Sequence, residues 1–402
     1  MGGAAEAYDE EAMSSGGKGD DGRAADPQGD LDIFTSEVVD RVRSAGNVWA
    51  LPGGQILMPR VFGFCRGVKR ALRMLAEACR RHCRGGKVLF LLGQIIHNPW
   101  VNAYYQRRCV RILQDEQIAE LDRYVGAEDC AIIPAFGVVP AVERRLAEIG
   151  CQVVDTTCGD VRRLWVWAER AVAKGFAVMI FGRATHDETV VTKRRLAEAG
   201  GLYLVVGNLD EANRFCRMVT GAEDPRGFAE GFGPQATNAD SLAPFLRLAQ
   251  VSQTTMLYDA TMEVRRLLKE AFSARFGRAE AKDRLLLHPT VCRATQDRQA
   301  AAVELCAAGV DLVVVVGGFG SSNTRHLYEL AREYAPAVFI EDAEAIVSER
   351  EVRALDLGLG EPVVARNWLP RRRPLRIGVL AGASSPEVVV GQVLERLAAF
   401  LR

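Results

Sequence analysis

The chain has 402 residues, of which 49% are hydrophobic and 25% are charged, and its formal net charge is zero. This composition is typical of a globular protein of two or three domains, and it gives no electrostatic reason to expect nucleic acid as a partner. No apolar run reaches the roughly 18 residues that span a bilayer, so we expect no membrane segment.

The N-terminal segment has a different composition. Residues 1–30 carry eight acidic and two basic side chains among many Gly, Ala and Ser residues. Residues 1–50 are therefore predicted to form a disordered acidic tail, with a possible short helix in "LDIFTSEVVDRVRSAG". Transit peptides are poor in acidic residues and signal peptides need an apolar core, so we expect a cytoplasmic protein. Its ten cysteines are then expected to be reduced.

From about residue 55, β-branched apolar runs alternate with amphipathic helical stretches such as 67–81 and 386–402, which predicts an α/β fold with mostly parallel sheets. The segment 221–244 is rich in Gly, Pro and Ala and is predicted to be a surface loop or insertion. The predicted strands, in chain order, are "KVLFLLG", "CAIIPAFG", "CQVVD", "FAVMIFG", "LYLVVG", "DLVVVVGG", "AVFIED" and "LRIGVLAG".

Polar stretches follow the apolar runs in a regular way. In open α/β sheets, ligands bind beyond the carboxyl ends of the strands, so six such loops predict one large central site assembled from several lobes. The loops are "GQIIHNP", "DTTCGDV", "GRATHDE", "SQTT", "GGFGSSNT" and "AGASSPE".

Three cysteines, Cys65, Cys158 and Cys292, stand at predicted strand-to-helix junctions among small or polar neighbours. A helix N-terminus favours the thiolate, which is the form that binds metal. Widely spaced single cysteines suit a metal cluster held between lobes, although spacing alone leaves unrelated thiols as the alternative. The other seven lie in helix or strand patterns and are interpreted as filler: Cys79, Cys83, Cys109, Cys130, Cys151, Cys216 and Cys306.

Three thiolates leave one iron of a [4Fe–4S] cubane without a protein ligand. Such an iron is a Lewis acid that can take a substrate oxygen. The pattern therefore indicates redox chemistry at a bound hydroxyl rather than simple electron transfer.

Other loops are suited to an anion. Ser321, Ser322 and Asn323 stand between a strand and a helix, and Ser384 stands in a similar loop. Helix N-termini and hydroxyls donate hydrogen bonds to phosphate oxygens, although a Ser/Gly loop can also be only a helix cap.

Two histidines and one glutamate complete the set of candidates. His97 and His186 lie in the polar loops and suit a diphosphate, with purely structural histidines as the alternative. Glu188 is a candidate proton donor, because burial can raise the pKa of a carboxyl group towards neutrality. The alternative is a solvated surface glutamate.

The ordered motifs "GFCRGVKRAL", "IIHNP", "DTTC", "THDETV", "SQTTM", "TVCRATQDRQ", "GGFGSSNT" and "AGASSPE" resemble the 4-hydroxy-3-methylbut-2-enyl diphosphate reductase family, in its plant and cyanobacterial branch. The resemblance implies three α/β lobes in a pseudo-threefold arrangement around a central cluster. We place lobe boundaries at 55–157, 158–290 and 291–402. It also implies the last step of the non-mevalonate isoprenoid pathway, which reductively removes an allylic hydroxyl to give isopentenyl and dimethylallyl diphosphate.

The resemblance also implies residue roles. Cys65, Cys158 and Cys292 would hold a [4Fe–4S] cluster with one open iron, and Glu188, helped by Thr254, would deliver a proton to the leaving hydroxyl. A ferredoxin or flavodoxin would supply electrons. The residues expected to hold the diphosphate are His97, His186, Ser321, Ser322, Asn323 and Ser384.

The chain departs from the family pattern at two places. Phe136 stands where many bacterial members have histidine, and Gly159–Asp160 follow Cys158 where the family typically has proline. These departures keep two other classes open: a sensing protein that retains the cluster without turnover, and a zinc or thiol enzyme that uses the same cysteines.

Overall fold

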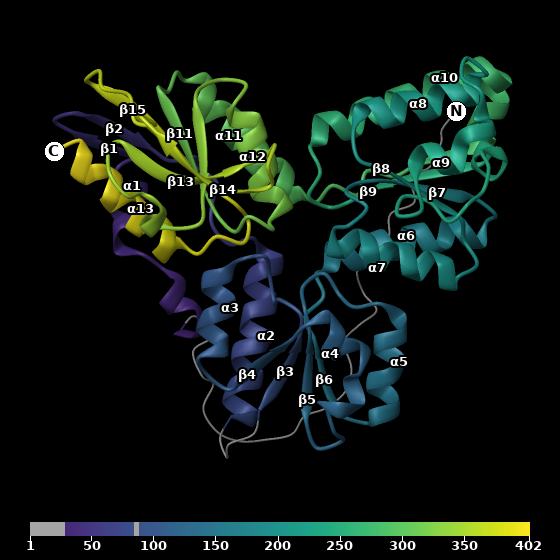
Figure 1. The fold of residues 1–402 in the computed structure, drawn as a ribbon, viewed down its shortest axis with the longest axis horizontal. Helices are drawn as coiled ribbons and strands as arrows, with labels where there is room; N and C mark the ends of the chain where they lie inside the picture. Colours follow the sequence, from purple (N-terminus) through teal and green to yellow (C-terminus); the bar gives the residue numbers. More distant parts are fainter. Residues whose placement is uncertain (1–28, 84–87) are drawn as a thin grey trace, which may run out of the picture.

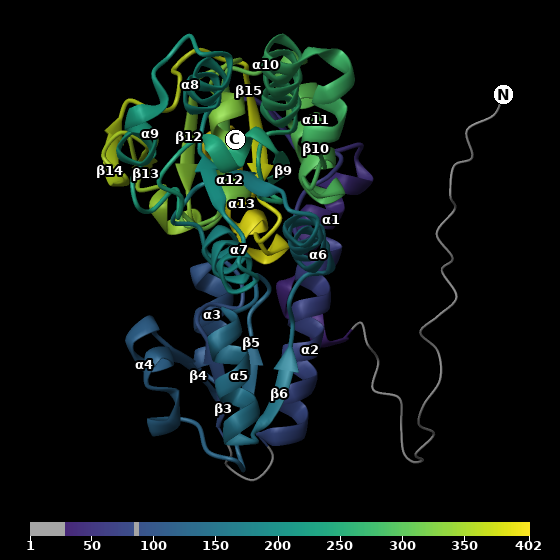
Figure 2. The ribbon, with the colours of Figure 1, turned by 90° about the vertical axis from the view of Figure 1, so that its right-hand side faces the viewer.

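The computed structural model describes residues 29–83 and 88–402. Within these residues the chain forms three lobes, each built on a parallel sheet with helices on both faces (Figure 1). Figure 2 shows lobe 1 below and lobes 2 and 3 above it. The predicted α/β class with mostly parallel sheets is confirmed.

Lobe 1 comprises residues 66–155. Its sheet has the order β4-β3-β5-β6, and every neighbouring pair is parallel. Its elements are α2 (Arg66–His82), β3 (Leu89–Leu92), α3 (Pro99–Gln106), β4 (Val110–Leu113), α4 (Asp115–Ala119), η2 (Leu121–Arg123), β5 (Cys130–Ile133), α5 (Pro140–Ile149) and β6 (Gln152–Asp155).

Lobe 2 comprises residues 159–287, and its parallel sheet has the order β10-β9-β7-β8. Its elements are α6 (Gly159–Ala173), β7 (Ala177–Phe181), α7 (Asp187–Glu198), β8 (Tyr203–Val206), α8 (Leu209–Thr220), η3 (Pro225–Gly227), α9 (Phe228–Phe232), η4 (Ala243–Leu246), β9 (Leu248–Ser252), α10 (Tyr258–Arg284) and β10 (Leu285–Leu287).

Lobe 3 joins residues 29–57 to residues 293–400. Its sheet has the order β1-β2-β15-β11-β12, in which only the pair β1–β2 is antiparallel. Its elements are η1 (Gly29–Phe34), α1 (Glu37–Ser44), β1 (Val48–Leu51), β2 (Gly54–Leu57), α11 (Arg293–Ala307), β11 (Leu312–Val316), α12 (Ser322–Ala331), β12 (Ala337–Ile340), η5 (Ala343–Ala345), the hairpin β13 (Glu351–Asp356) and β14 (Glu361–Arg366), β15 (Leu375–Ala381) and α13 (Glu387–Phe400).

The three lobes share one strand order. In lobes 1 and 2 the fourth strand of the lobe lies at one edge, followed by the third, the first and the second. Lobe 3 repeats this order with β2, β15, β11 and β12, so its fourth strand comes from the N-terminal part of the chain. This repetition is the pseudo-threefold arrangement that the sequence resemblance implied.

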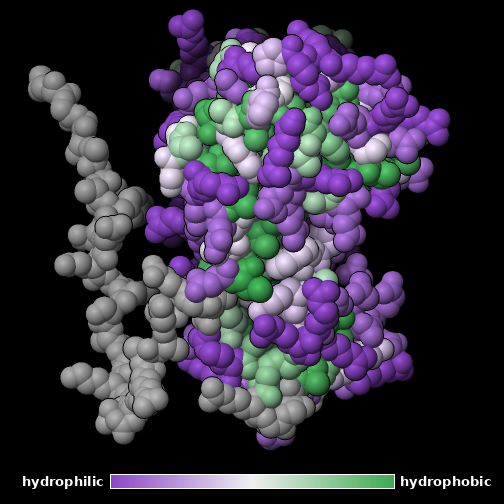
Figure 3. Space-filling view, turned by 90° about the vertical axis from the view of Figure 1, so that its left-hand side faces the viewer, coloured by the Kyte–Doolittle hydropathy of each residue, from purple (hydrophilic) through white to green (hydrophobic). Residues whose placement is uncertain are grey.

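Alternation along the buried strands explains the layers. In β11, Leu312, Val314 and Val316 face the core formed with α1 and α13, while Val313 and Val315 face α11 and α12. Successive side chains of a strand point to opposite faces, so a continuous apolar run must be covered on both. Hydrophilic residues cover most of the outer face seen in Figure 3, with hydrophobic residues interspersed.

Three sequence expectations need correction or restriction. The boundary placed at residue 55 falls inside β2, which belongs to the sheet of lobe 3. The segment 221–244 is not simply a surface loop, because it contains η3 and α9 and buries Phe228 and Leu242 in the core of lobe 2. The predicted disordered tail, residues 1–50, lies outside the described residues up to residue 28, and residues 29–50 instead contain η1, α1 and the start of β1. The helix α1 lies within the stretch named as a possible helix.

Two further findings concern disulfide bonds and membrane-spanning helices, neither of which was expected from the sequence. Cys83 and Cys109 form a disulfide, which contradicts the expectation that all ten cysteines are reduced. In the part of the chain that the structure describes, no helix is both long enough and apolar enough to cross a membrane.

Candidate active site between the three lobes

Cys65, Cys158 and Cys292 occupy equivalent positions. Each is the N-cap of the helix that follows the fourth strand of one of the three repeated sheets. These helices are α2 after β2, α6 after β6 and α11 after β10. All three thiols are half-buried. A helix N-terminus presents unpaired N–H groups and a positive partial charge, which stabilise a thiolate.

The backbone fixes each cysteine in the same way. The N–H of Cys65 donates to the carbonyl of Ala383 at 3.2 Å, that of Cys158 to Ala135 at 2.8 Å, and that of Cys292 to Thr254 at 2.9 Å. Each acceptor stands two residues after the end of the neighbouring strand of that sheet. The threefold repeat of the sheets therefore extends to the hydrogen bonds that hold the three cysteines.

The sulfur atoms of Cys65 and Cys158 lie close to Gly67. A Cβ atom at this glycine would lie 2.8 Å from the Sγ of Cys158 and 3.8 Å from the Sγ of Cys65. Any larger residue would therefore fill the space between the two thiols. Cys292 lies near enough to Cys65 for their charges to interact, and its Sγ lies 3.2 Å from the hydroxyl of Thr295.

Burial opposes ionisation of these thiols when nothing is bound to them. It raises the pKa of Cys158 and raises the pKa of Cys292 to about 11. A buried cation compensates nearby: Arg298 is 5% exposed, interacts with Cys65 and Cys292, and has an Nε atom without a hydrogen-bond partner. An anionic centre among the thiols would satisfy this guanidinium.

Glu188 lies in the first turn of α7 and is only 3% exposed. Its carboxyl group accepts hydrogen bonds from the backbone N–H and the hydroxyl of Thr254, both at 2.7 Å. Burial raises the pKa of Glu188 to about 7, even though the two bonds from Thr254 act in the opposite direction. A carboxyl group with this pKa holds and releases a proton near neutral pH.

His97 and His186 lie together, with ring centroids 5.3 Å apart, and Phe136 stacks on His97 at 4.4 Å. The Nδ1 of His186 accepts the backbone N–H of Glu188, which leaves its Nε2 to carry a proton. Burial lowers the pKa of His97 and lowers the pKa of His186 to about 3. The carboxylate of Asp187, 3.6 Å from the Nε2 of His97, opposes the effect of burial on His97 but does not outweigh it. Both imidazoles are therefore neutral N–H donors.

The predicted serine and asparagine donors come together across lobe 3. Ser384 donates to the His97 carbonyl at 3.3 Å, and its hydroxyl lies 3.4 Å from that of Ser321. Asn323 accepts the N–H of Ala383, while its own amide nitrogen is buried without a partner. Ser322 accepts a hydrogen bond from Gln253 at 3.1 Å. The unpaired donor of Asn323 and the nearby hydroxyls suit an anion.

A cavity of about 270 Å³ opens beside the two histidines. His97 and His186 line it together with Arg183, Arg325 and Gly320. The carboxylate of Asp187 also lines the cavity and offsets part of the positive charge of the two arginines, which are suited to binding phosphate oxygens.

Sequence reasoning missed two buried residues of this network. Gln253 connects lobes 2 and 3 by bonding the backbone N–H of Arg183 and the hydroxyl of Ser322. The second is His326, which is 6% exposed and whose Nδ1 lies 2.8 Å from the carbonyl of Thr255. His326 stands four residues after Ser322 in the same helix, so both side chains lie on one face, and this spacing could have predicted that His326 belongs to the network.

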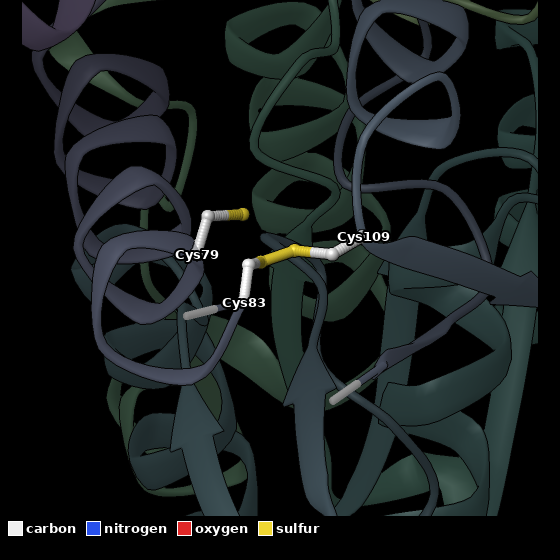
Figure 4. Close-up of side chains that lie close together, drawn as sticks. All are labelled: Cys79, Cys83 and Cys109. Atoms are coloured by element: carbon white, nitrogen blue, oxygen red, sulfur yellow. A yellow bond between two sulfur atoms is a disulfide. The ribbon is translucent and has the colours of Figure 1, made fainter. Parts of the chain in front are cut away.

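A second group of cysteines lies in lobe 1, away from these loops. Among the residues that the structure describes, Cys79, Cys83 and Cys109 are the group of three whose sulfurs all lie within 4.8 Å of one another (Figure 4). The central cysteines do not meet that limit. This difference fits their expected ligands, because each thiolate of a cubane binds a different iron, whereas ligands of one ion must crowd around it.

The central residues thus fit an iron–sulfur cluster. They provide three thiols at helix N-termini, a glycine that keeps the space between two of them open, and a buried arginine. Together with the histidines and arginines that line the cavity, they form the candidate active site of a three-lobed α/β protein.

Comparison with known proteins agrees with this description. The family model "LytB protein" matches residues 56–398, and the chain belongs to this family. A 4-hydroxy-3-methylbut-2-enyl diphosphate reductase from Gloeobacter violaceus is 35% identical over 384 residues, which cover 94% of this chain and 90% of the relative. The reductase from Thermosynechococcus vestitus is 33% identical over 90% of this chain and 89% of its own length.

Solved structures show the same fold. A structure of (E)-4-hydroxy-3-methyl-but-2-enyl diphosphate reductase, described as the terminal enzyme of the non-mevalonate pathway, aligns with a TM-score of 0.51 and 25% identity over 86% of this chain and 99% of its own. A Plasmodium falciparum reductase structure aligns with a TM-score of 0.62 and 20% identity, covering 85% and 87% of the two chains.

Proposed function

We propose that this chain is a 4-hydroxy-3-methylbut-2-enyl diphosphate reductase, which converts its substrate into isopentenyl and dimethylallyl diphosphate. The net reaction adds two electrons and two protons, breaks the allylic C–O bond and releases water. The observation that carries the proposal is the chain of hydrogen bonds from Glu188 through Thr254 to Cys292. It connects a buried carboxyl group to the backbone of one of the central thiol loops.

The proposed cofactor is a [4Fe–4S] cluster held by Cys65, Cys158 and Cys292. When bound, it would supply electrons and one iron without a protein thiolate, acting as a Lewis acid. Arg298 would balance part of the negative charge of the thiolates. The sequence-based alternative of a zinc or thiol enzyme uses the same residues and is separated from this proposal by the metal that they hold.

The substrate's diphosphate would lie against His97, His186 and the N-terminus of α12. Ser321, Ser322, Asn323 and Ser384 would provide neutral donors, and the negative charge of the diphosphate would raise the pKa of both imidazoles. Neutral donors with a helix N-terminus hold an anion without requiring a buried cation at each contact.

Glu188 would hold the proton that the leaving hydroxyl needs. In its protonated form it can donate, and the hydroxyl and backbone N–H of Thr254 keep its carboxyl group oriented in either protonation state. The surrounding protein excludes water, so the proton is delivered to the substrate oxygen instead of being lost to solvent. We also propose ferredoxin or flavodoxin as electron donor and the cytoplasm as the compartment.

The test is an anaerobic assay with reduced methyl viologen and the hydroxymethylbutenyl diphosphate, combined with iron and acid-labile sulfide analysis. We expect about four irons and four sulfides per chain and formation of both products. Cluster-loaded protein that consumes no substrate would contradict the enzymatic proposal and favour a sensing protein. Stoichiometric zinc without sulfide would contradict the cofactor.

A further inference from the structure

Cys79, Cys83 and Cys109 bring three sulfurs together at the far end of α2. Cys79 lies in the last turns of α2, and Cys83 is its C-cap. Cys109 stands directly before β4 and is bonded to Cys83. In Figure 4 the free thiol of Cys79 points towards this disulfide.

We propose that these three residues form a thiol–disulfide exchange site, in which Cys109 pairs with either Cys83 or Cys79. The site lies outside the proposed active site, and the inference does not depend on the proposed reaction.

Helix geometry makes Cys109 the shared partner. The N–H of Cys83 bonds the carbonyl of Cys79 at 3.0 Å, so these two residues are one helical turn apart. Cβ atoms at this spacing are roughly 5–6 Å apart, whereas a disulfide needs about 3.5–4.5 Å. A Cys79–Cys83 bond would therefore break the helical turn. Cys109 lies outside this helix, directly before β4, and its sulfur is close to those of both Cys79 and Cys83.

The exchange step balances without any other reactant. The thiolate of Cys79 attacks the Sγ of Cys109, an S–S bond forms between them, and the Cys83–Cys109 bond breaks. The electron pair leaves on Cys83, which takes up the proton that Cys79 lost. Closing the first bond from the reduced state needs an oxidant: a small disulfide accepts two electrons from two cysteine thiols and leaves as two thiols.

The site is accessible to such a reagent. A cavity of about 580 Å³ is lined by all three cysteines together with Arg80 and Arg108. Cationic neighbours favour a thiolate over a thiol. Burial nevertheless raises the pKa of Cys79 to about 11 against the opposing effect of Arg108, so exchange at neutral pH is slow.

The same positive surroundings weigh against the rival occupant, a soft metal ion. Three thiols within 4.8 Å of one another could hold one. The charge of Arg108, which acts on Cys79, would repel a divalent cation at this place, whereas it does not affect a neutral disulfide.

Peptide mapping tests the proposal. Protein purified anaerobically would be incubated with glutathione disulfide, blocked with iodoacetamide and digested without reduction. We expect wild type to give the Cys83–Cys109 peptide and Cys83→Ser to give the Cys79–Cys109 peptide, roughly tenfold above its wild-type level. In Cys109→Ser, the matched control, Cys79 and Cys83 should carry glutathione without bonding each other.

A folded Cys83→Ser protein without the Cys79–Cys109 peptide would overturn the proposal, as would three alkylated thiols in oxidised wild type or one zinc ion per chain retained by the three thiols. If circular dichroism shows that Cys83→Ser does not fold, the same peptide mapping of wild type held at alkaline pH tests the proposal instead. There the Cys79–Cys109 peptide should grow as the Cys83–Cys109 peptide falls, and constant amounts of both would overturn the proposal.

Discussion

One helix connects two different kinds of cysteine group. The N-cap of α2 is Cys65, one of three thiols that come from distant parts of the sequence and meet between the lobes. Its C-cap is Cys83, which is bonded to Cys109 within lobe 1. The N-terminal end of a helix favours negative charge and the C-terminal end disfavours it. The helix therefore favours a thiolate metal ligand at one end and a neutral disulfide at the other.

The largest expected effect comes from removing one central thiol. Cys292→Ser should lose most of the bound iron and sulfide, and its turnover should fall by more than the roughly 100-fold caused by losing a hydrogen-bond partner of a metal ligand. Iron analysis and the anaerobic assay measure both effects. Cys109→Ser is the matched control and should keep its iron. The opposite result, with iron lost only from Cys109→Ser, would place the metal in lobe 1.

Glu188→Gln tests whether proton delivery belongs to the central group. Turnover should fall by ~10²–10⁴ because an amide cannot donate the proton of a carboxyl group, while iron content and the visible spectrum stay unchanged. In wild type, kcat/KM should fall as pH rises through about 7, where Glu188 loses its proton. Glu198→Gln, at the exposed end of α7, is the control. A lost spectrum would show that Glu188 supports the cluster instead.

Sequence patterns located the central group because the signal was local. Continuous apolar runs such as residues 312–316 mark strands buried on both faces, and polar residues directly after such strands must meet at one edge of a sheet. Each central cysteine also stood next to small or polar residues, a context that differs from that of Cys79 or Cys306.

The remaining features depend on contacts between distant segments. The segment 54–57 is too short for periodicity to reveal that it pairs with β15, more than 300 residues later. Phe228 is buried although Gly and Pro surround it in sequence, because the other aromatic residues of lobe 2 cover it. The Cys83–Cys109 bond depends on the turn before β4 meeting the end of α2, which no spacing rule specifies.

The lobe 1 cysteines should affect stability rather than turnover. The bridge joins residues 26 positions apart, and a loop of that size is expected to stabilise the fold by about 3 kcal/mol. Oxidised wild type should therefore resist urea better than Cys109→Ser, and a reductant should remove the difference. Cys79→Ser should behave like wild type. Equal urea resistance of oxidised wild type and Cys109→Ser would show that the bridge does not stabilise the fold.

The smallest effect concerns the charge that this chain places beside the central thiols. Asp160, two residues after Cys158, raises the pKa values of Cys158, Cys292 and Glu188 through its negative charge. It also lies 3.2 Å from Arg163, which offsets part of that charge. In Asp160→Asn the pKa of Glu188 should therefore fall, and the alkaline limb of the kcat/KM profile should move to lower pH by less than about one unit. Glu169→Gln removes a charge further along α6 and should leave the profile in place. A shift of the Asp160→Asn profile to higher pH would contradict the assigned effect of the Asp160 charge on Glu188.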